Sequence, residues 1–115
     1  MKLPHADRLE ITKAKVVQYL LSSTHRIGKG KAAFFSAIGF TIAHWKDLAH
    51  ALEQHAQDNT VTFTDATAFG TRYVIEGSLV APNGRELQVR TVWFIDKGDH
   101  APRFVTAYPL QRRTP

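Results

Sequence analysis

Cysteine is absent from the chain, which excludes disulfide bonds and thiolate metal sites. No run of about 18 apolar residues occurs either, so the sequence predicts no membrane-spanning helix and no membrane partner. The first residues, "MKLPHADRLEIT", lack the apolar stretch of a secretory signal peptide. The lack of cysteine is compatible with a reducing compartment. We therefore expect it to act in the cytoplasm, a location that is also compatible with delivery into another cell.

Acidic residues are few relative to basic ones. Lys and Arg outnumber Asp and Glu by 15 to 10, and the isoelectric point is about 9.8. A basic small domain is typical of nucleic-acid binders, although five net charges also suit a merely soluble protein. The length of 115 residues indicates a single domain, 1–115, that can bury a stable core without disulfide bonds or metal sites.

The hydrophobic pattern changes near Asn59, from helical spacing before it to alternation after it. Thr12 is a plausible N-cap for the first helix, and Gly39 is a plausible stop for the second. The expected helices span residues 12–22, 30–38 and 43–57. The expected strands span residues 61–65, 71–80, 86–96 and 103–110. Helices followed by successive strands predict an α+β fold, with three N-terminal helices and then a four-stranded antiparallel sheet.

The turn Pro82-Asn83-Gly84 sets which side chains share a face of the sheet. It suits a three-residue hairpin loop in which Gly84 takes the left-handed position. Leu79 then lies opposite Leu87, and Tyr73 lies opposite Trp93. A shift of the register by one residue would mix apolar and polar side chains on both faces.

This register predicts one apolar and one polar face. The apolar face, which we expect to contact the helices, contains Tyr73, Ile75, Leu79, Leu87, Val89, Trp93 and Ile95. The polar face contains Arg72, Val74, Glu76, Gln88, Arg90, Val92 and Phe94. Because helices cover one side of such a sheet, the polar side stays open to a ligand.

The segment "STHRIGKGK" places His25, Lys29 and Lys31 just before an expected helix. Free backbone N–H groups at a helix N-terminus favour anions, and histidine exchanges protons near neutral pH. The spacing does not match the nucleotide-binding phosphate loop. The segment is therefore either a solvated loop with incidental charge or an anion site.

Two further pairs of residues have a structural and a functional interpretation. Arg72 and Arg90 point to the same side of neighbouring strands, where they can hold phosphate or pair with Glu76. With one acid for two arginines, we expect at least one cation to stay unpaired. Thr106 and Tyr108 share a face of the last strand, where Tyr108 can be a core residue or a site residue.

The histidines of the third expected helix do not form a metal site. His44, His50 and His55 are separated by six and five residues, so they do not stack on one face. No other set of residues indicates metal binding, and we expect neither a metal nor an organic cofactor.

The order of these elements resembles a known group of proteins. Short helices, a cationic His/Lys segment and a sheet ending in "VTAYP" are similar to the metal-independent bacterial ribonuclease toxins of the barnase, EndoU, colicin and RelE (BECR) type. The segment "KVVQYLLSSTHRIGKGKAAFFSAIGF" is also similar to toxin-tip domains of secreted polymorphic toxins, many of them uncharacterised. The stretches "FGTRYVIEG", "VRTVWFI" and "VTAYPL" extend the similarity over nearly the whole chain. In two features the sequence departs from these families: it has Ser22 after "YLL", and no second histidine lies in an obvious partner position.

The resemblance implies an endoribonuclease toxin that cleaves RNA, for example tRNA or mRNA, through the 2′-OH. It implies an acidic antitoxin or immunity protein as inhibitor. The expected catalytic residues are His25, Lys31, Thr106 and Tyr108, and the expected phosphate-binding residues are Lys29, Arg72 and Arg90. The alternative function is that of a non-catalytic interaction domain that binds an acidic protein with the same residues.

Overall fold

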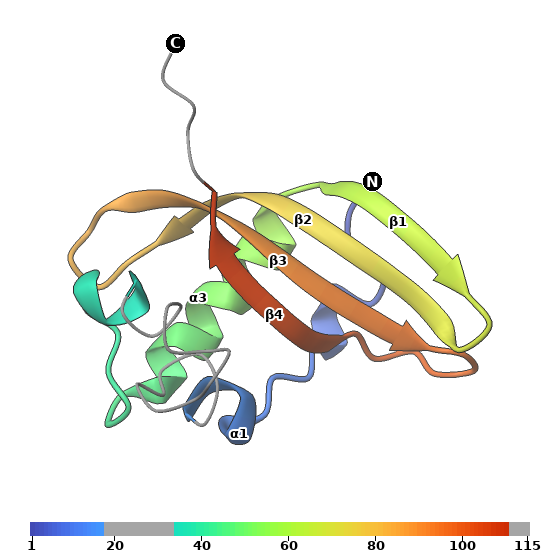
Figure 1. Ribbon diagram of the computed structural model, residues 1–115, viewed down its shortest axis with the longest axis horizontal. Coiled ribbons are helices and arrows are strands. Elements are labelled where there is room, and N and C mark those ends of the chain that lie inside the picture. The colour runs from blue at the N-terminus through green and yellow to red at the C-terminus, as the bar shows by residue number, and fades with distance from the viewer. Residues whose placement is uncertain (18–33, 111–115) are drawn as a thin grey trace, which may run out of the picture.

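The computed structural model describes residues 1–17 and 34–110. Its fold is α+β, and helical segments precede a four-stranded antiparallel sheet, as the sequence predicts (Figure 1). A short 3₁₀ helix, η1, comes first. The elements are η1 (Ala6–Arg8), α1 (Lys13–Lys15), a helical segment at 34–37, α3 (Trp45–Asp58), β1 (Val61–Thr67), β2 (Gly70–Val80), β3 (Glu86–Asp96) and β4 (Arg103–Pro109).

The first two expected helices are confirmed only where the structure describes them. Thr12 caps α1, because its hydroxyl oxygen accepts a hydrogen bond of 3.2 Å from the backbone N–H of Lys15. The second helix is described at 34–37 and ends at Gly39, which has a φ of 106°. Residues 18–22 and 30–33 of the expected ranges 12–22 and 30–38 lie outside the described residues.

Helix α3 forms because its apolar residues recur at helical spacing and face the sheet. Leu48, Leu52 and Ala56 are fully buried, and Trp45 packs against the core as a half-buried residue. This is the predicted apolar face of the third helix. His55 is also buried, at 2% exposure, which the sequence does not predict.

The sheet is a simple meander with the order β1-β2-β3-β4. The predicted hairpin register is correct, with Leu79 opposite Leu87 and Tyr73 opposite Trp93. The backbone N–H of Ala81 donates to the carbonyl of Arg85 at 2.9 Å and closes the three-residue loop. Gly84 adopts a φ of 83°, the left-handed conformation that its lack of a Cβ allows.

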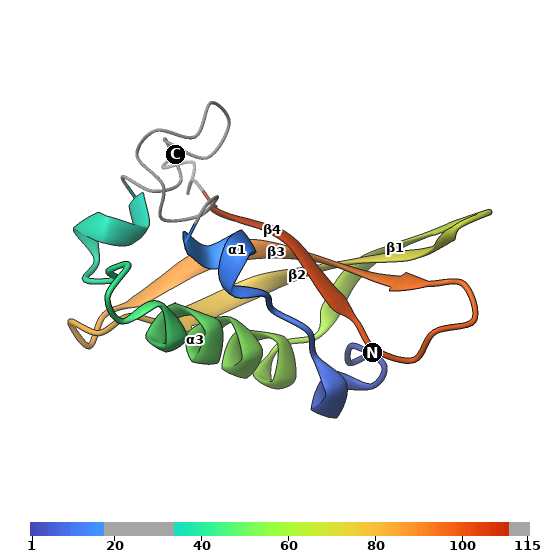
Figure 2. The same ribbon diagram turned by 90° about the horizontal axis from the view of Figure 1, so that it is seen from below.

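The core lies between the helices and one face of the sheet. Trp93 is fully buried and its indole N–H donates to the hydroxyl of Thr91 at 2.9 Å, which satisfies two buried polar groups. None of the described helices covers the opposite face, which we call the open face, and the strand ends near the β1–β2 and β3–β4 turns extend past α3 (Figure 2). None of the described helices has the length and apolar composition that crossing a membrane requires.

Candidate functional site

A shallow concavity of about 300 Å³ lies on the open face. It forms because the strand register places side chains from all four strands next to one another. Glu76 lies opposite Arg90, and Arg90 lies opposite Tyr108, so that these three residues form a row across β2, β3 and β4. The next row brings Phe63, Val74 and Val92 together. The lining residues are Thr62, Phe63, Arg72, Val74, Glu76, Arg90, Val92 and Tyr108.

Arg90 is the centre of this site. Its Nε and Nη2 atoms donate to Oε2 of Glu76 at 3.0 and 2.6 Å, and its Nη1 atom donates to the hydroxyl oxygen of Tyr108 at 3.0 Å. The hydrogen bonds to Tyr108 and Glu76 raise the pKa of Arg90 above its already high value, so the guanidinium stays charged. A carboxylate, a guanidinium and a phenol are thereby fixed in one line, with the Arg90 side chain still 37% exposed.

Arg72 is not left without an acidic partner, which corrects the expectation of an unpaired cation. Its Nη2 atom lies 3.9 Å from Oδ2 of Asp65 on β1, and its guanidinium lies 5.9 Å from the centre of the Phe63 ring. Both ends of the ion pair are about half exposed, at 47% and 50%. Such a loose surface pair is weak, so an incoming anion can replace Asp65 at little cost.

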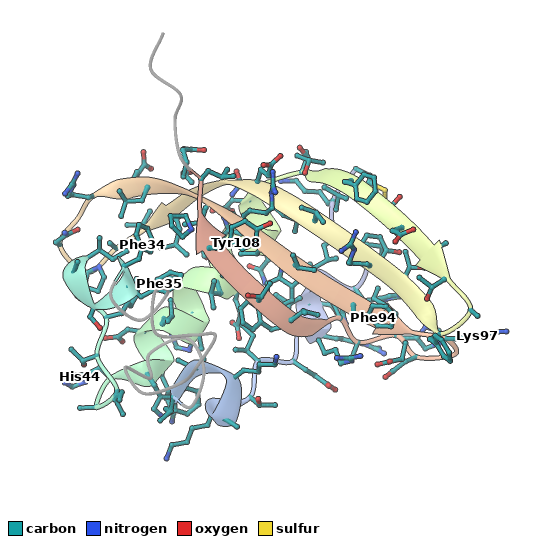
Figure 3. All side chains as sticks on the ribbon, in the orientation of Figure 1. Phe34, Phe35, His44, Phe94, Lys97 and Tyr108 are labelled. Carbon is teal, nitrogen blue, oxygen red and sulfur yellow. The ribbon has the colours of Figure 1, made fainter. Side chains whose placement is uncertain are left out.

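Tyr108 and Thr106 lie on the open face, as the predicted alternation requires. They lie opposite Arg90 and Val92 respectively, so Tyr108 lines the concavity and is not part of the core cluster. Figure 3 shows Tyr108 toward one end of the sheet and Phe94 toward the other. Thr106 adjoins the concavity but does not line it.

A second group made of an arginine, an acid and an aromatic ring lies toward the β3–β4 turn. Nε of Arg103 donates to Oδ2 of Asp96 at 2.9 Å, and the Arg103 guanidinium lies 5.0 Å from the centre of the Phe94 ring. The hydrogen bond from Arg103 lowers the pKa of Asp96. Each arginine in β2, β3 and β4 therefore has one acid and one aromatic ring beside it.

The predicted residues His25, Lys29 and Lys31 lie outside the described residues. That they share a site with Arg90 therefore stays a prediction. The distribution of charge is nevertheless informative. Five basic residues and none of the acids fall in segments 18–33 and 111–115, namely Arg26, Lys29, Lys31, Arg112 and Arg113. The remaining chain has ten basic and ten acidic residues, so the whole formal net charge of +5 belongs to these two segments.

The described histidines do not supply a second acid–base group to the concavity. His100 lies in the β3–β4 turn, where its ring packs edge-on against His5 at 5.3 Å, and His44 and His50 are exposed on the helical side. Within residues 1–17 and 34–110, no three His, Asp or Glu side chains are grouped as metal ligands would be.

The sequence matches the model of a family described as Domain of unknown function (DUF6883) over residues 2–111. The chain belongs to this family. The search of curated proteins gives no significant match. A solved structure, "Contact-dependent growth inhibition toxin - immunity protein complex from Klebsiella pneumoniae 342", contains a chain with a TM-score of 0.70 and 16% identity. The alignment covers 93% of this chain and 97% of that one, so this family member shares the fold over nearly its full length.

The sequence pattern indicates Glu76 only as a charge partner and does not place β1 at the site. Strand β1 is left out because only the β2–β3 hairpin has a turn that fixes its register. That register does place Glu76 opposite Arg90, but it gives the carboxylate no role beyond pairing with the arginine. Extending the alternation through "DATAFGT" pairs Asp65 with Arg72 and Phe63 with Val74, as observed. The short turn between β1 and β2 was the available signal.

Proposed function

We propose that this chain is a metal-independent endoribonuclease of the toxin kind, which cuts RNA by attack of a 2′-OH on the neighbouring phosphate. The observation that carries the proposal is the row Glu76–Arg90–Tyr108 in the concavity of the open face. The resemblance of the sequence to barnase-type ribonucleases points to the same chemistry.

Cleavage of this kind needs a base, a group that stabilises the negative charge of the phosphorane, and an acid. Arg90 is the central phosphate ligand, because its charge is permanent and its N–H groups point along the row. Arg72, at the other side of the concavity, is the second phosphate ligand once its loose contact with Asp65 opens. Tyr108 accepts a hydrogen bond from Arg90, which leaves its own O–H free to donate to a phosphate or leaving-group oxygen.

Two groups compete for the role of the base. His25 is the residue that the sequence favours, and Lys29 and Lys31 accompany it as phosphate ligands. Glu76 is the described alternative, since its carboxylate lies in the concavity beside Arg90. Where Glu76 is the base, His25 is the acid that protonates the 5′-oxygen. Thr106, adjoining the concavity, is assigned to orienting the substrate.

The enzyme would need an inhibitor in the cell that makes it. An acidic antitoxin or immunity protein fits the positive charge concentrated in segments 18–33 and 111–115. The similar solved structure is itself a complex of a toxin with an immunity protein, which supports this kind of partner.

The decisive experiment is incubation of the purified protein with total RNA in EDTA. We expect cleavage without metal, products that end in a 2′,3′-cyclic phosphate, and no cut at a 2′-O-methyl nucleotide. A requirement for Mg²⁺, or cleavage of the 2′-O-methyl substrate, would exclude the mechanism. Arg85→Ala in the hairpin loop is a matched control, because this arginine lies outside the concavity.

A second function, that of a non-catalytic interaction domain, is favoured by the charge pairing on the open face. Arg72, Arg90 and Arg103 each have an acidic neighbour, so the face itself is not a strong polyanion site. Arginine and aromatic residues are both enriched at protein interfaces. Absence of cleavage on every RNA tested, with folded protein, would favour this function.

A further inference from the structure

Strand β1 is an edge of the sheet that the described residues leave largely uncovered. Six of its seven residues are exposed, and only Val61 is partly buried. Figure 2 shows the β1–β2 end of the sheet extending past α3, so that neither face of β1 is covered by that helix. An exposed edge of this kind is a template for another strand.

The register shows which backbone groups point outward. The hydroxyl of Thr62 donates to the carbonyl of Val74 at 3.2 Å, so this carbonyl faces β1. Backbone groups alternate between the two neighbouring strands, so Tyr73 and Thr71 turn theirs toward β3. Their partners on β1, Thr64 and Ala66, therefore direct N–H and C=O away from the sheet. Among described residues, the backbone bond on this edge joins Val61 N–H to the carbonyl of Met1, at 2.7 Å.

The other edge of the sheet is protected. The backbone N–H of Phe104 donates to the carbonyl of Glu10 at 2.9 Å, and Lys15 Nζ donates to the carbonyl of Val105 at 3.1 Å. Pro109 also ends β4. Natural edge strands are usually blocked by proline, lysine, a bulge or a covering segment. Strand β1, "VTFTDAT", has neither proline nor lysine, and its one register shift lies between Val61 and Phe63, before the outward-facing Thr64 and Ala66. The contrast within one sheet points to a function for the β1 edge.

We infer that the β1 edge binds an extended segment of a second protein, which pairs with Thr64 and Ala66 as a fifth strand. The side chains of β1 specify the chemistry of that segment. Phe63 is 53% exposed on the open face and offers an apolar contact. Asp65 is half exposed on the same face, so the residue opposite it is basic or carries a hydroxyl, and an acid there is repelled.

A second copy of this chain fits the edge less well. The two-fold antiparallel register that uses both outward residues pairs Thr64 of one copy with Ala66 of the other. That register places Asp65 directly opposite its own copy, and like charges in this position are destabilising. The carboxylates thus act against self-association and favour a different protein. The inference is independent of whether the chain cleaves RNA.

The probe is a synthetic peptide with the 7-residue length of β1, made of threonine with lysine opposite Asp65 and valine opposite Phe63. Backbone amide exchange of the full-length protein is followed by NMR. When nine molecules in ten are bound, exchange at Thr64 and Ala66 is expected to slow roughly tenfold. The same peptide with N-methyl groups on the amides that face β1 should give no protection, and glutamate in place of lysine should weaken binding.

Two variants distinguish backbone pairing at the β1 edge from non-specific peptide binding. Thr64→Pro removes an outward N–H without breaking a bond to β2, so the fold should survive while peptide binding is lost. Thr64→Val keeps the N–H and should bind as the parent does. No protection at millimolar peptide, or equal protection by the N-methylated peptide, would overturn the inference. Protection at Thr64 and Ala66 that appears without peptide as protein concentration rises would show a second copy on the edge instead.

Discussion

His55 Nδ1 lies 3.0 Å from the carbonyl oxygen of Ser78 and joins α3 to β2 inside the protein. A carbonyl can only accept, so Nδ1 carries the proton and Nε2 is unprotonated. Nε2 is buried without a hydrogen-bond partner in the described part of the chain. Burial lowers the pKa of His55, against the opposing effect of the hydrogen bond to Ser78.

The first prediction is a loss of stability in acid that depends on His55. The unfolded state takes up a proton near the ordinary histidine pKa of about 6.5, whereas the folded state resists it. The stabilisation is therefore complete above that pH. It is lost as the pH falls through the lowered pKa that His55 has in the folded state. Urea unfolding should show a smaller fall in unfolding free energy between neutral pH and pH 5 for His55→Gln than for the parent. The exposed His50→Gln is the matched control, and an equal fall in all three proteins would contradict the assignment.

The second prediction concerns Gly77, where a Cβ would collide with the side-chain amide of Asn59. Asn59 is held there because its Nδ2 atom donates to the carbonyl of His55 at 2.9 Å. Gly77→Ala should cost about 1–3 kcal/mol, the usual range for overpacking. Adding Asn59→Ala should recover part of that loss, since contacting residues are not additive. Strictly additive losses in a double-mutant cycle would show that the collision is not the cause.

The α+β architecture and the β2–β3 register follow from the sequence because local signals decide them. Gly84 fixes the loop, and the alternation on both sides of it then places Trp93 and Arg90 on opposite faces. The burial of His55 does not follow from the sequence, because its partner, the carbonyl of Ser78, is a backbone group 23 residues away. The pairing of Asp65 with Arg72 does follow from extending the alternation through the short β1–β2 turn, but no turn motif comparable to Pro82-Asn83-Gly84 draws attention to it.

The third prediction separates the charge of Arg90 from its geometry. Arg90→Lys keeps the cation but cannot bridge Glu76 and Tyr108 at once, because an ammonium lacks the planar fork. We expect RNA cleavage to fall by roughly 10- to 100-fold, with the fold unchanged by circular dichroism. Arg85→Lys, in the exposed hairpin loop, should leave the rate unchanged. A fully active Arg90→Lys enzyme would show that only the charge matters.

The fourth prediction concerns the salt dependence of RNA binding. Because the described residues are electrically balanced, most of the dependence should come from segments 18–33 and 111–115. Lys29→Gln with Lys31→Gln should lower the log–log salt slope by about 1.4, at about 0.7 per phosphate contact on a single strand. Arg72→Ala with Arg90→Ala should flatten it as well. Lys46→Gln with Lys97→Gln removes two exposed lysines from the described part, and a slope change as large as that of the Lys29/Lys31 variant would refute the localisation.

The last prediction assigns the acid and the base. His25→Ala should lower the cleavage rate by on the order of 100-fold, the scale of a positioned acid or base. Glu76→Gln should do the same where Glu76 is the base, and much less where it only holds Arg90. Tyr108→Phe should lose little where Tyr108 orients phosphate and about as much as His25→Ala where it donates the proton.

The pH profile of cleavage decides between these assignments, because a base must be deprotonated and an acid protonated in the active enzyme. If Glu76 is the base and His25 the acid, the cleavage rate of the parent has a bell-shaped dependence on pH. Glu76→Gln then removes the acidic limb, and His25→Ala removes the limb near neutral pH. If His25 is the base, its loss removes the acidic limb and Glu76→Gln leaves the shape unchanged. Profiles of identical shape for the parent and both variants, with rates lowered only by lost binding, would assign neither residue to proton transfer.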